Sequence, residues 1–171
     1  MRKTKVGVVG FGYWGKNQAR VFHELGVLEG IFDSKLNLKK DKNYKFYDNL
    51  DELIDAVDGI IICTPADTHY EIAKKALKKV DILVEKPLAL KSSQVKSLIN
   101  IEKKNNKLIM VGHQLHFHPA VLKMKDLINS GEIGKIKWIY SNRLNMGKIR
   151  PYENVLWSFA PHDISLMLDF V

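Results

Sequence analysis

Cysteine is almost absent from the sequence, since Cys63 is the only one among 171 residues. A single cysteine excludes an internal disulfide and fits the reducing cytoplasm, where we expect the protein. Long apolar runs are also missing: no stretch reaches about 18 apolar residues, so we expect no membrane-spanning helix and no membrane partner. The N-terminal segment MRKTKVGVVG turns apolar but stops at glycines, which indicates a first strand rather than a signal peptide.

Acidic residues are outnumbered, because 19 Asp and Glu face 27 Lys and Arg, for a net charge of +8. The lysines are scattered over predicted helix faces, as in IAKKALKK, and no cluster of arginine with aromatic residues is visible. This distribution is typical of a solvated surface, so we expect no nucleic-acid partner. A basic surface still attracts anionic small molecules, which leaves an anionic cofactor or substrate open.

Short apolar runs alternate with helical patterns through the first two thirds of the chain. The strand candidates are residues 5–10, 28–33, 59–64, 81–85 and 107–112, and the helix candidates lie near 14–25, 50–56, 69–79 and 92–105. The runs are apolar throughout, which indicates strands covered on both faces and hence a parallel sheet. Repeated strand–helix–strand units predict an α/β Rossmann fold with a doubly wound parallel sheet.

The pattern changes after Gly112. Residues 118–134 read as a helix, residues 135–144 (KIKWIYSNRL) alternate in the manner of an antiparallel strand, and residues 157–171 read as an apolar helix. These elements are too few for a second core. We therefore predict a Rossmann domain over 1–116, an incomplete α+β substrate domain over 117–171, and a chain that is the N-terminal fragment of a longer protein.

The glycines of GFGYWG have the spacing of a dinucleotide-binding turn. Gly10, Gly12 and Gly15 form the pattern G-x-G-x-x-G directly after a predicted strand and at the start of a predicted helix. The first glycine permits the tight turn, the second lets the backbone approach a pyrophosphate, and the third allows close helix–sheet packing. In this context the spacing predicts a nicotinamide dinucleotide site.

Two further predicted strand ends carry cofactor candidates. Asp33 ends the second strand, where a carboxylate binds the adenosine ribose hydroxyls and repels the 2′-phosphate of NADP, so NAD is favoured even with Lys35 nearby. Thr64 and Pro65 form the turn after the strand 59–64, at the edge where ligands of such sheets bind. His69 begins the next helix and either contacts the cofactor or caps the helix.

The segment DILVEKPLAL ends a buried run in two opposite charges and a proline. Lys86 at the carboxyl end of this strand can hold a substrate hydroxyl beside a nicotinamide and promote loss of its proton as hydride leaves. Glu85 would orient the ammonium, and Pro87 would fix the turn. A surface ion pair is the simpler alternative.

The glycine turn, CTPADTH, EKPLAL and GHQLHFHPA together resemble the Gfo/Idh/MocA family of nicotinamide-dependent sugar oxidoreductases, over nearly the whole chain. The resemblance implies that Lys86 is catalytic and that His162 in APHDIS is its acid–base partner. We include Phe11, Tyr13 and Trp14, which lie between the glycines, with Gln114 of the last motif, Glu85 and Lys86 among the candidate cofactor contacts.

The segment RLNMGKIRPYENVLWSFAPHDIS is similar to the subgroup that oxidises the 3-hydroxyl of UDP-linked N-acetylhexosamines or their uronic acids. The resemblance implies substrate contacts from Lys86, His162 and a basic set that would suit a diphosphate or carboxylate: Arg143, Asn145, Lys148 and Arg150. A free polyol or inositol, a non-catalytic NAD-binding module, and transient oxidation within an elimination or epimerisation remain alternatives. In this family the longer protein is expected to form a homo-oligomer.

Two positions depart from the family pattern. Ser158 stands where many relatives carry aspartate four residues before the catalytic histidine, and His116 stands where arginine often precedes the proline that is here Pro119. Although His113, His116 and His118 lie close together, no cysteine or obvious carboxylate ligand accompanies them, and a lysine can supply the charge that hydride transfer needs. We therefore expect no metal.

Overall fold

The computed structural model describes residues 3–35, 41–144 and 154–171. The chain divides into two compact units, Met1–Gly112 and His113–Val171.

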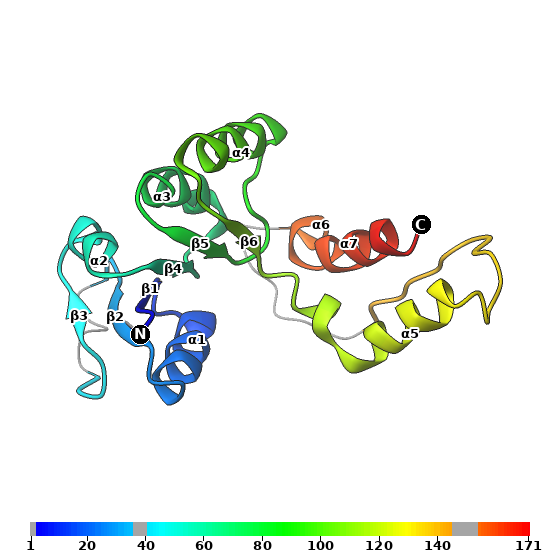
Figure 1. Cartoon of the computed structure of the whole chain (residues 1–171), viewed down its shortest axis with the longest axis horizontal. Coiled ribbons are helices and arrows are strands. Elements are labelled where there is room, and N and C mark those ends of the chain that lie inside the picture. The colour runs from blue at the N-terminus through cyan, green and yellow to red at the C-terminus, as the bar shows by residue number, and fades with distance from the viewer. Residues whose placement is uncertain (1–2, 36–40, 145–153) are drawn as a thin grey trace. The chain divides into compact units, whose positions relative to one another are not determined.

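The first unit is built on a single six-stranded parallel sheet (Figure 1). Its strand order is β3-β2-β1-β4-β5-β6. The strands are β1 (Val6–Val9), β2 (Leu28–Phe32), β3 (Phe46–Tyr47), β4 (Gly59–Ile62), β5 (Asp81–Val84) and β6 (Ile109–Val111). Every neighbouring pair runs parallel. This is the predicted doubly wound Rossmann arrangement, with β3 as the one strand that the sequence did not indicate.

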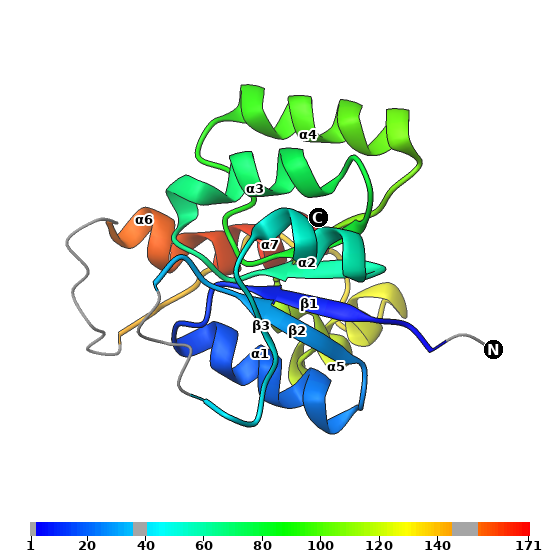
Figure 2. The same ribbon diagram turned by 90° about the vertical axis from the view of Figure 1, so that its left-hand side faces the viewer.

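Helices cover both faces of this sheet. They are α1 (Tyr13–Glu24), α2 (Leu50–Ala56), α3 (His69–Ala76) and α4 (Ser92–Asn105), with the short 3-10 turn η2 (Ala66–Thr68) before α3. Figure 2 shows α1 on one face of the sheet and α2, α3 and α4 on the other. Because both faces are covered, the central strands can be apolar along their whole length.

Two hydrophobic clusters fill the space between these layers. On the α2–α4 side, Leu53, Leu77 and Leu98 are fully buried against strand residues such as Ile62. On the α1 side, the smaller cluster joins Val8, Phe11, Ala19, Ile31 and Ile61. Alternate residues of one strand therefore supply both clusters, as the side-chain period of two requires.

The strand order reverses between β1 and β4, which makes the carboxyl ends of these strands the expected ligand crevice. Backbone hydrogen bonds continue the ladder past the strand ends. Gly10 N–H donates to the Phe32 carbonyl at 2.8 Å, Cys63 N–H to the Val9 carbonyl at 2.8 Å, and Glu85 N–H to the Ile62 carbonyl at 2.9 Å. The predicted glycine turn, Thr64 turn and Lys86 turn thus share one edge of the sheet.

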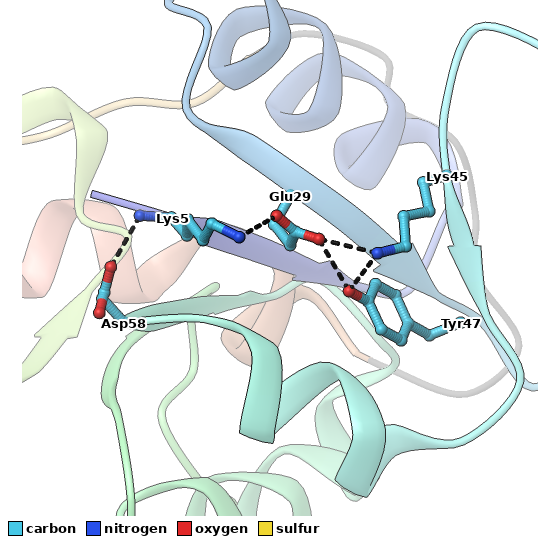
Figure 3. Close-up of polar contacts among 5 residues, drawn as sticks. All are labelled: Lys5, Glu29, Lys45, Tyr47 and Asp58. Carbon is cyan, nitrogen blue, oxygen red and sulfur yellow. Dashed lines mark hydrogen bonds and ion pairs between the residues drawn. The ribbon is translucent and has the colours of Figure 1, made fainter. Parts of the chain in front are cut away.

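The opposite, amino edge of the sheet is held by an ionic network (Figure 3). The Glu29 carboxylate lies 2.8 Å from the Nζ atoms of both Lys5 and Lys45, and it accepts a 2.9 Å hydrogen bond from the Tyr47 hydroxyl. The Lys5 N–H donates to the Asp58 carboxylate at 2.8 Å. Hydrogen bonds from Lys45 and Lys5 lower the pKa of Glu29 from 4.5 to about 2.

The second unit contains the 3-10 turn η3 (Gln114–Phe117) and the helices α5 (Pro119–Asn129), α6 (Val155–Ser158) and α7 (Ala160–Phe170). The strand predicted over residues 135–144 is wrong, because these residues pair with no strand in the described chain. Alternation records which side chains share a face, whereas a strand also needs a neighbour for its backbone hydrogen bonds.

No helix among the described residues is both long and apolar enough to cross a membrane.

Candidate active site

The glycine turn has the backbone geometry that a dinucleotide site requires. Gly10 has a φ of +91°, a conformation that L side chains rarely adopt. A Cβ atom added to Gly15 would lie 1.8 Å from the Gly10 carbonyl oxygen, so only glycine allows α1 to pack this close to the turn. A Cβ atom on Gly12 would meet nothing within 4 Å, which leaves open space at the N-terminus of α1 for a ligand.

Asp33 joins the end of β2 to this turn. Its Oδ2 accepts a 2.6 Å hydrogen bond from the Phe11 N–H, and its Oδ1 accepts a 2.7 Å bond from the Lys35 N–H. Each carboxylate oxygen retains a lone pair for a ribose hydroxyl. The Phe11 ring is only 2% exposed and packs on Tyr44 and Phe46, so a cofactor contact from Phe11 would have to come from its backbone.

Two aromatic side chains stand outward beside the glycines. Tyr13 is 79% exposed, Trp14 is 39% exposed, and their rings contact each other edge to face at 5.6 Å. The open Gly12, the helix N-terminus and the Asp33 carboxylate fit a dinucleotide: the turn would hold the pyrophosphate and Asp33 the ribose.

The turn after β4 is tied to the turn after β5 by His69. Its Nδ1 lies 2.7 Å from the Pro87 carbonyl oxygen, and its Nε2 lies 2.8 Å from the Thr64 carbonyl oxygen. The ring is 1% exposed. Both ring nitrogens are therefore engaged by the protein itself, and the predicted contact between His69 and the cofactor stays a prediction.

The Glu85–Lys86–Pro87 turn follows β5 at the same edge, and its Lys86–Pro87 peptide bond is cis. Lys86 is half-buried. Burial raises the pKa of Glu85, although the Lys86 N–H, the Lys86 and His69 charges and a hydrogen bond from Gln18 oppose it. A Cβ atom on Gly112 would lie 3.3 Å from the Glu85 carboxyl, so Gly112 leaves room for this side chain.

Cys63 precedes the Thr64 turn and has no nucleophilic character. Burial and the nearby Glu85 charge raise the pKa of its thiol to about 12. Since the thiolate is the reactive form, Cys63 acts as a small apolar residue at the base of the turn.

The second unit carries the remaining candidates. His162 lies on α7 and is 9% exposed. The Arg143 Nε donates to the Asp163 carboxylate at 2.6 Å, and Ser141 donates to the same carboxylate at 2.9 Å. Burial raises the pKa of Asp163, but these hydrogen bonds outweigh it and the net direction is downward. Gln114 begins η3 and is exposed. Asn145, Lys148 and Arg150 lie outside the described residues.

Comparison with known proteins identifies the family. Residues 4–113 match the model of the oxidoreductase family Gfo/Idh/MocA, described as an NAD-binding Rossmann fold. The chain belongs to the Gfo/Idh/MocA family. Its first unit is thus an NAD-binding Rossmann domain, which confirms the predicted fold, cofactor and resemblance.

Individual relatives within this oxidoreductase family have different substrates. The UDP-N-acetylglucosamine 3-dehydrogenase of Acidithiobacillus ferrooxidans is 26% identical over 98% of this chain and 54% of its own length. An inositol 2-dehydrogenase/D-chiro-inositol 3-dehydrogenase of Lactiplantibacillus plantarum is 29% identical over 88% of this chain and 47% of its own length. The chain therefore spans about half the length of these curated relatives.

A solved structure supports the same fold. An NAD-binding protein from Listeria innocua superposes with a TM-score of 0.83 at 22% identity, covering 99% of this chain and 55% of that one.

The histidines near Pro119 have separate contacts in this Gfo/Idh/MocA chain. The His116 Nδ1 lies 3.1 Å from the Asp169 carboxylate, which Lys125 also approaches at 2.7 Å. The His118 Nδ1 accepts the Ala120 N–H at 3.2 Å and caps α5. Within residues 3–35, 41–144 and 154–171, no three His, Cys, Asp or Glu side chains form a group able to hold a metal.

Three features of this site were not predicted from the sequence. Gln18 acts on the Glu85 carboxyl as a hydrogen-bond donor, and Gly112 makes room for that carboxyl. Gln18 follows Gly15 by three residues on one helix, a spacing that places it on the same face and could have indicated it. The two carbonyl contacts of His69 join residues 5 and 18 positions away, and no local pattern predicts them.

Proposed function

We propose that the protein is an NAD-dependent dehydrogenase that oxidises a CH–OH group of a sugar, most specifically C3 of a UDP-N-acetylhexosamine or its uronic acid. The observation that carries the proposal is the position of Lys86. It follows β5 at the edge of the sheet that bears the glycine turn and Asp33. A purely structural ion pair would not need to lie at this edge.

Lys86 would act on the substrate hydroxyl. When bound, NAD supplies the hydride acceptor. Lys86 in its neutral form accepts the hydroxyl proton at Nζ, and the resulting ammonium stabilises charge on the oxygen. His162 is the proposed second acid–base group. Since Ser158 supplies no carboxylate to hold a charged imidazole, Lys86 carries the larger share of the proton transfer.

The nucleotide-sugar assignment draws on a relative and on charge. The UDP-N-acetylglucosamine 3-dehydrogenase matches 98% of this chain. Arg143 offers a planar guanidinium of the kind that binds phosphate or carboxylate oxygens bidentately. We propose Arg143, Asn145, Lys148 and Arg150 as substrate contacts, and a role in nucleotide-sugar metabolism for the cytoplasmic, homo-oligomeric protein.

A second candidate function is the oxidation of a free polyol or inositol. It is favoured by the inositol dehydrogenase relative at 29% identity. Such a substrate carries no phosphate, so it would not need the basic set around Arg143. A non-catalytic NAD-binding module is the third candidate, and it would need neither Lys86 nor His162.

The experiment is a calorimetric titration of the chain with NAD and NADP, followed by NADH formation with UDP-N-acetylglucosamine, its uronic acid and inositol. We expect micromolar NAD binding and much weaker NADP binding by this chain, and turnover of a UDP-sugar by a longer protein that contains it. The Lys86→Met variant should lose turnover with at most a small loss of NAD affinity, whereas the control Lys104→Met, on the exposed end of α4, should change neither.

Each alternative function predicts a different outcome of this experiment. Turnover of inositol but of no UDP-sugar would replace the first substrate class with the second. NAD binding without turnover of any substrate, by this chain and by a longer one, would favour the binding module. Tight NADP binding would overturn the role given to Asp33.

A further inference from the structure

His69 contacts two hydrogen-bond acceptors at once. Its Nδ1 lies 2.7 Å from the Pro87 carbonyl oxygen, and its Nε2 lies 2.8 Å from the Thr64 carbonyl oxygen. Both distances are those of good hydrogen bonds, and the ring is 1% exposed, so water cannot readily replace either partner. His69 is the first residue of α3, and its ring contacts the turn after β4 and the turn after β5 at the cofactor edge.

Carbonyl oxygens only accept hydrogen bonds, so each contact requires a hydrogen on the imidazole nitrogen. A neutral imidazole carries one N–H and one bare lone pair, whereas the imidazolium carries two N–H groups. In a neutral ring, one of the two short contacts would bring a nitrogen lone pair against a carbonyl oxygen. The geometry therefore requires both nitrogens to be protonated.

We propose that His69 is a buried imidazolium that joins the turn after β4 to the turn after β5 and thereby positions Lys86. The role as a positioning residue rests on the function proposed above, because Lys86 directly precedes the Pro87 whose carbonyl His69 holds. The protonation state does not rest on it.

A buried cation needs compensation, and the two turns supply it. The two carbonyl dipoles point their negative ends at the ring, and charge-assisted hydrogen bonds of this kind are about twice as strong as neutral ones. The titratable groups on the joined turns are Cys63, Glu85 and Lys86. Of these, Glu85 feels the His69 charge, which acts to lower its pKa against the effect of burial. In the proposed arrangement an ionised Glu85 is the counter-charge of the buried imidazolium, although burial keeps the net direction of the Glu85 pKa upward.

The two hydrogen bonds of His69 would fix the geometry of the sheet edge that carries the cofactor turn and the Lys86 turn. One bond fixes Thr64, which with Pro65 forms the candidate cofactor turn, and the other fixes the residue after Lys86. Losing one N–H would release one of the two turns and leave a buried carbonyl without its donor. The Thr64 turn and the Lys86 turn would then no longer be held in a fixed position relative to each other.

The first test is the protonation state of the wild-type chain, measured by NMR on protein with 15N-labelled histidine at neutral pH. Comparison with the His69→Gln spectrum assigns the signals. We expect both His69 ring nitrogens to resonate as protonated nitrogens and to exchange slowly with solvent. A His69 spectrum with one bare nitrogen would overturn the imidazolium, whether or not the protein turns over a sugar.

The second test is the positioning role. His69→Gln offers its N–H groups from a single amide nitrogen and can replace at most one of the two contacts. It should lower NAD affinity about tenfold, the loss of one charge-assisted hydrogen bond, and shift the backbone amide signal of Lys86. The matched control is His23→Gln, which changes an exposed histidine near the far end of α1. Unchanged affinity and an unmoved Lys86 signal would overturn the positioning role. If His69→Gln does not fold, His69→Asn replaces it, and the wild-type spectrum still decides the protonation state.

Discussion

The two units of the chain differ in how they bury apolar side chains. In the described residues every fully buried hydrophobic side chain lies between Val8 and Leu98, inside the first unit. In the second unit, His162 is the one buried residue of those described, while Trp138, Tyr140 and Leu168 are each at least 70% exposed. Helices form in both units, so secondary structure alone does not make a core.

The difference shows which part of the site the chain can organise by itself. Gly10 and Asp33 come directly after strands, and Thr64 and Lys86 come one residue later. The side chains of these strands are packed on both faces, so the core fixes the backbone positions of the turns. Arg143 lies outside any helix or strand and His162 lies on α7, in a unit with no buried hydrophobic side chain among its described residues. We therefore expect the core to preorganise the cofactor edge and to hold the proposed substrate residues Arg143 and His162 less firmly.

The largest expected effect compares one leucine from each unit. Leu98→Ala removes a fully buried side chain from the α4 side of the sheet and should lower the free energy of unfolding by about 2–5 kcal/mol. Leu168→Ala removes a side chain that is 73% exposed on α7 and should change it by less than about 0.5 kcal/mol. Denaturant unfolding followed by circular dichroism measures both. Equal losses would mean that the second unit packs a core of its own.

The next effect separates packing from ligand binding within the glycine turn. Gly15→Ala places a Cβ atom 1.8 Å from the Gly10 carbonyl oxygen, so it should lower the free energy of unfolding by about 1–3 kcal/mol and weaken NAD binding. Gly12→Ala meets nothing within 4 Å, so it should leave stability nearly unchanged and weaken NAD binding alone. Thermal unfolding and NAD calorimetry on both variants provide the check. NAD affinity that survives Gly12→Ala would contradict a pyrophosphate at this turn.

A smaller effect depends on pH and concerns the amino edge of the first unit. The folded-state pKa of Glu29 is about 2, below the ordinary 4.5, so folding favours its ionised form. Its contribution is fully present above about pH 4.5 and is lost as the pH falls from there through about 2. With solvent screening we expect Glu29→Gln to cost on the order of 1–2 kcal/mol at neutral pH and almost nothing near pH 2.

The control for this pH effect is Glu24→Gln, which removes the exposed i,i+4 pair with Arg20. It should cost less than about 0.5 kcal/mol. Unfolding free energies measured from pH 7 to pH 2 test both variants. A Glu29→Gln penalty that stays constant over this range would contradict an ionic origin.

Most of the first unit could be predicted because its signals are local. Continuous apolar runs indicated β1, β2, β4, β5 and β6, and the glycine spacing indicated the turn after β1. The two-residue strand β3 was missed, because Phe46 and Tyr47 are too few to form a pattern. Strand ends of a parallel sheet share one edge, so the grouping of Asp33 and Lys86 with the glycines also followed from sequence.

The remaining features depend on contacts between distant residues. Residues 135–144 alternate like a strand, yet no described strand pairs with them, and alternation cannot reveal whether a neighbour exists. Likewise, His69 begins a helix as predicted, but its contacts with the Thr64 and Pro87 carbonyls follow from how two turns meet across the sheet. Local patterns indicate candidate residues, and packing decides what they touch.

The smallest effect on stability is expected at Arg143, in the second unit. The Arg143 and Asp163 side chains are 31% and 21% exposed, so Arg143→Gln should cost only about 0.2–1 kcal/mol. It should also raise the pKa of Asp163, because the Arg143 hydrogen bond and charge that oppose the effect of burial are lost. Denaturant unfolding and the NMR titration of the Asp163 carboxyl measure these two changes.

The Arg143→Gln variant also separates substrate binding from NAD binding. If Arg143 binds the diphosphate or carboxylate of the substrate, Arg143→Gln in an active, longer protein should raise KM for the UDP-sugar about tenfold or more and leave NAD affinity unchanged. Asp163→Asn is the matched control, since it removes the partner of the same ion pair but keeps the guanidinium. A parallel loss of NAD affinity in Arg143→Gln would mean that the second unit and the NAD-binding unit are not independent. Such a result would contradict the expectation that the core of the first unit organises the cofactor edge independently of the proposed substrate residues.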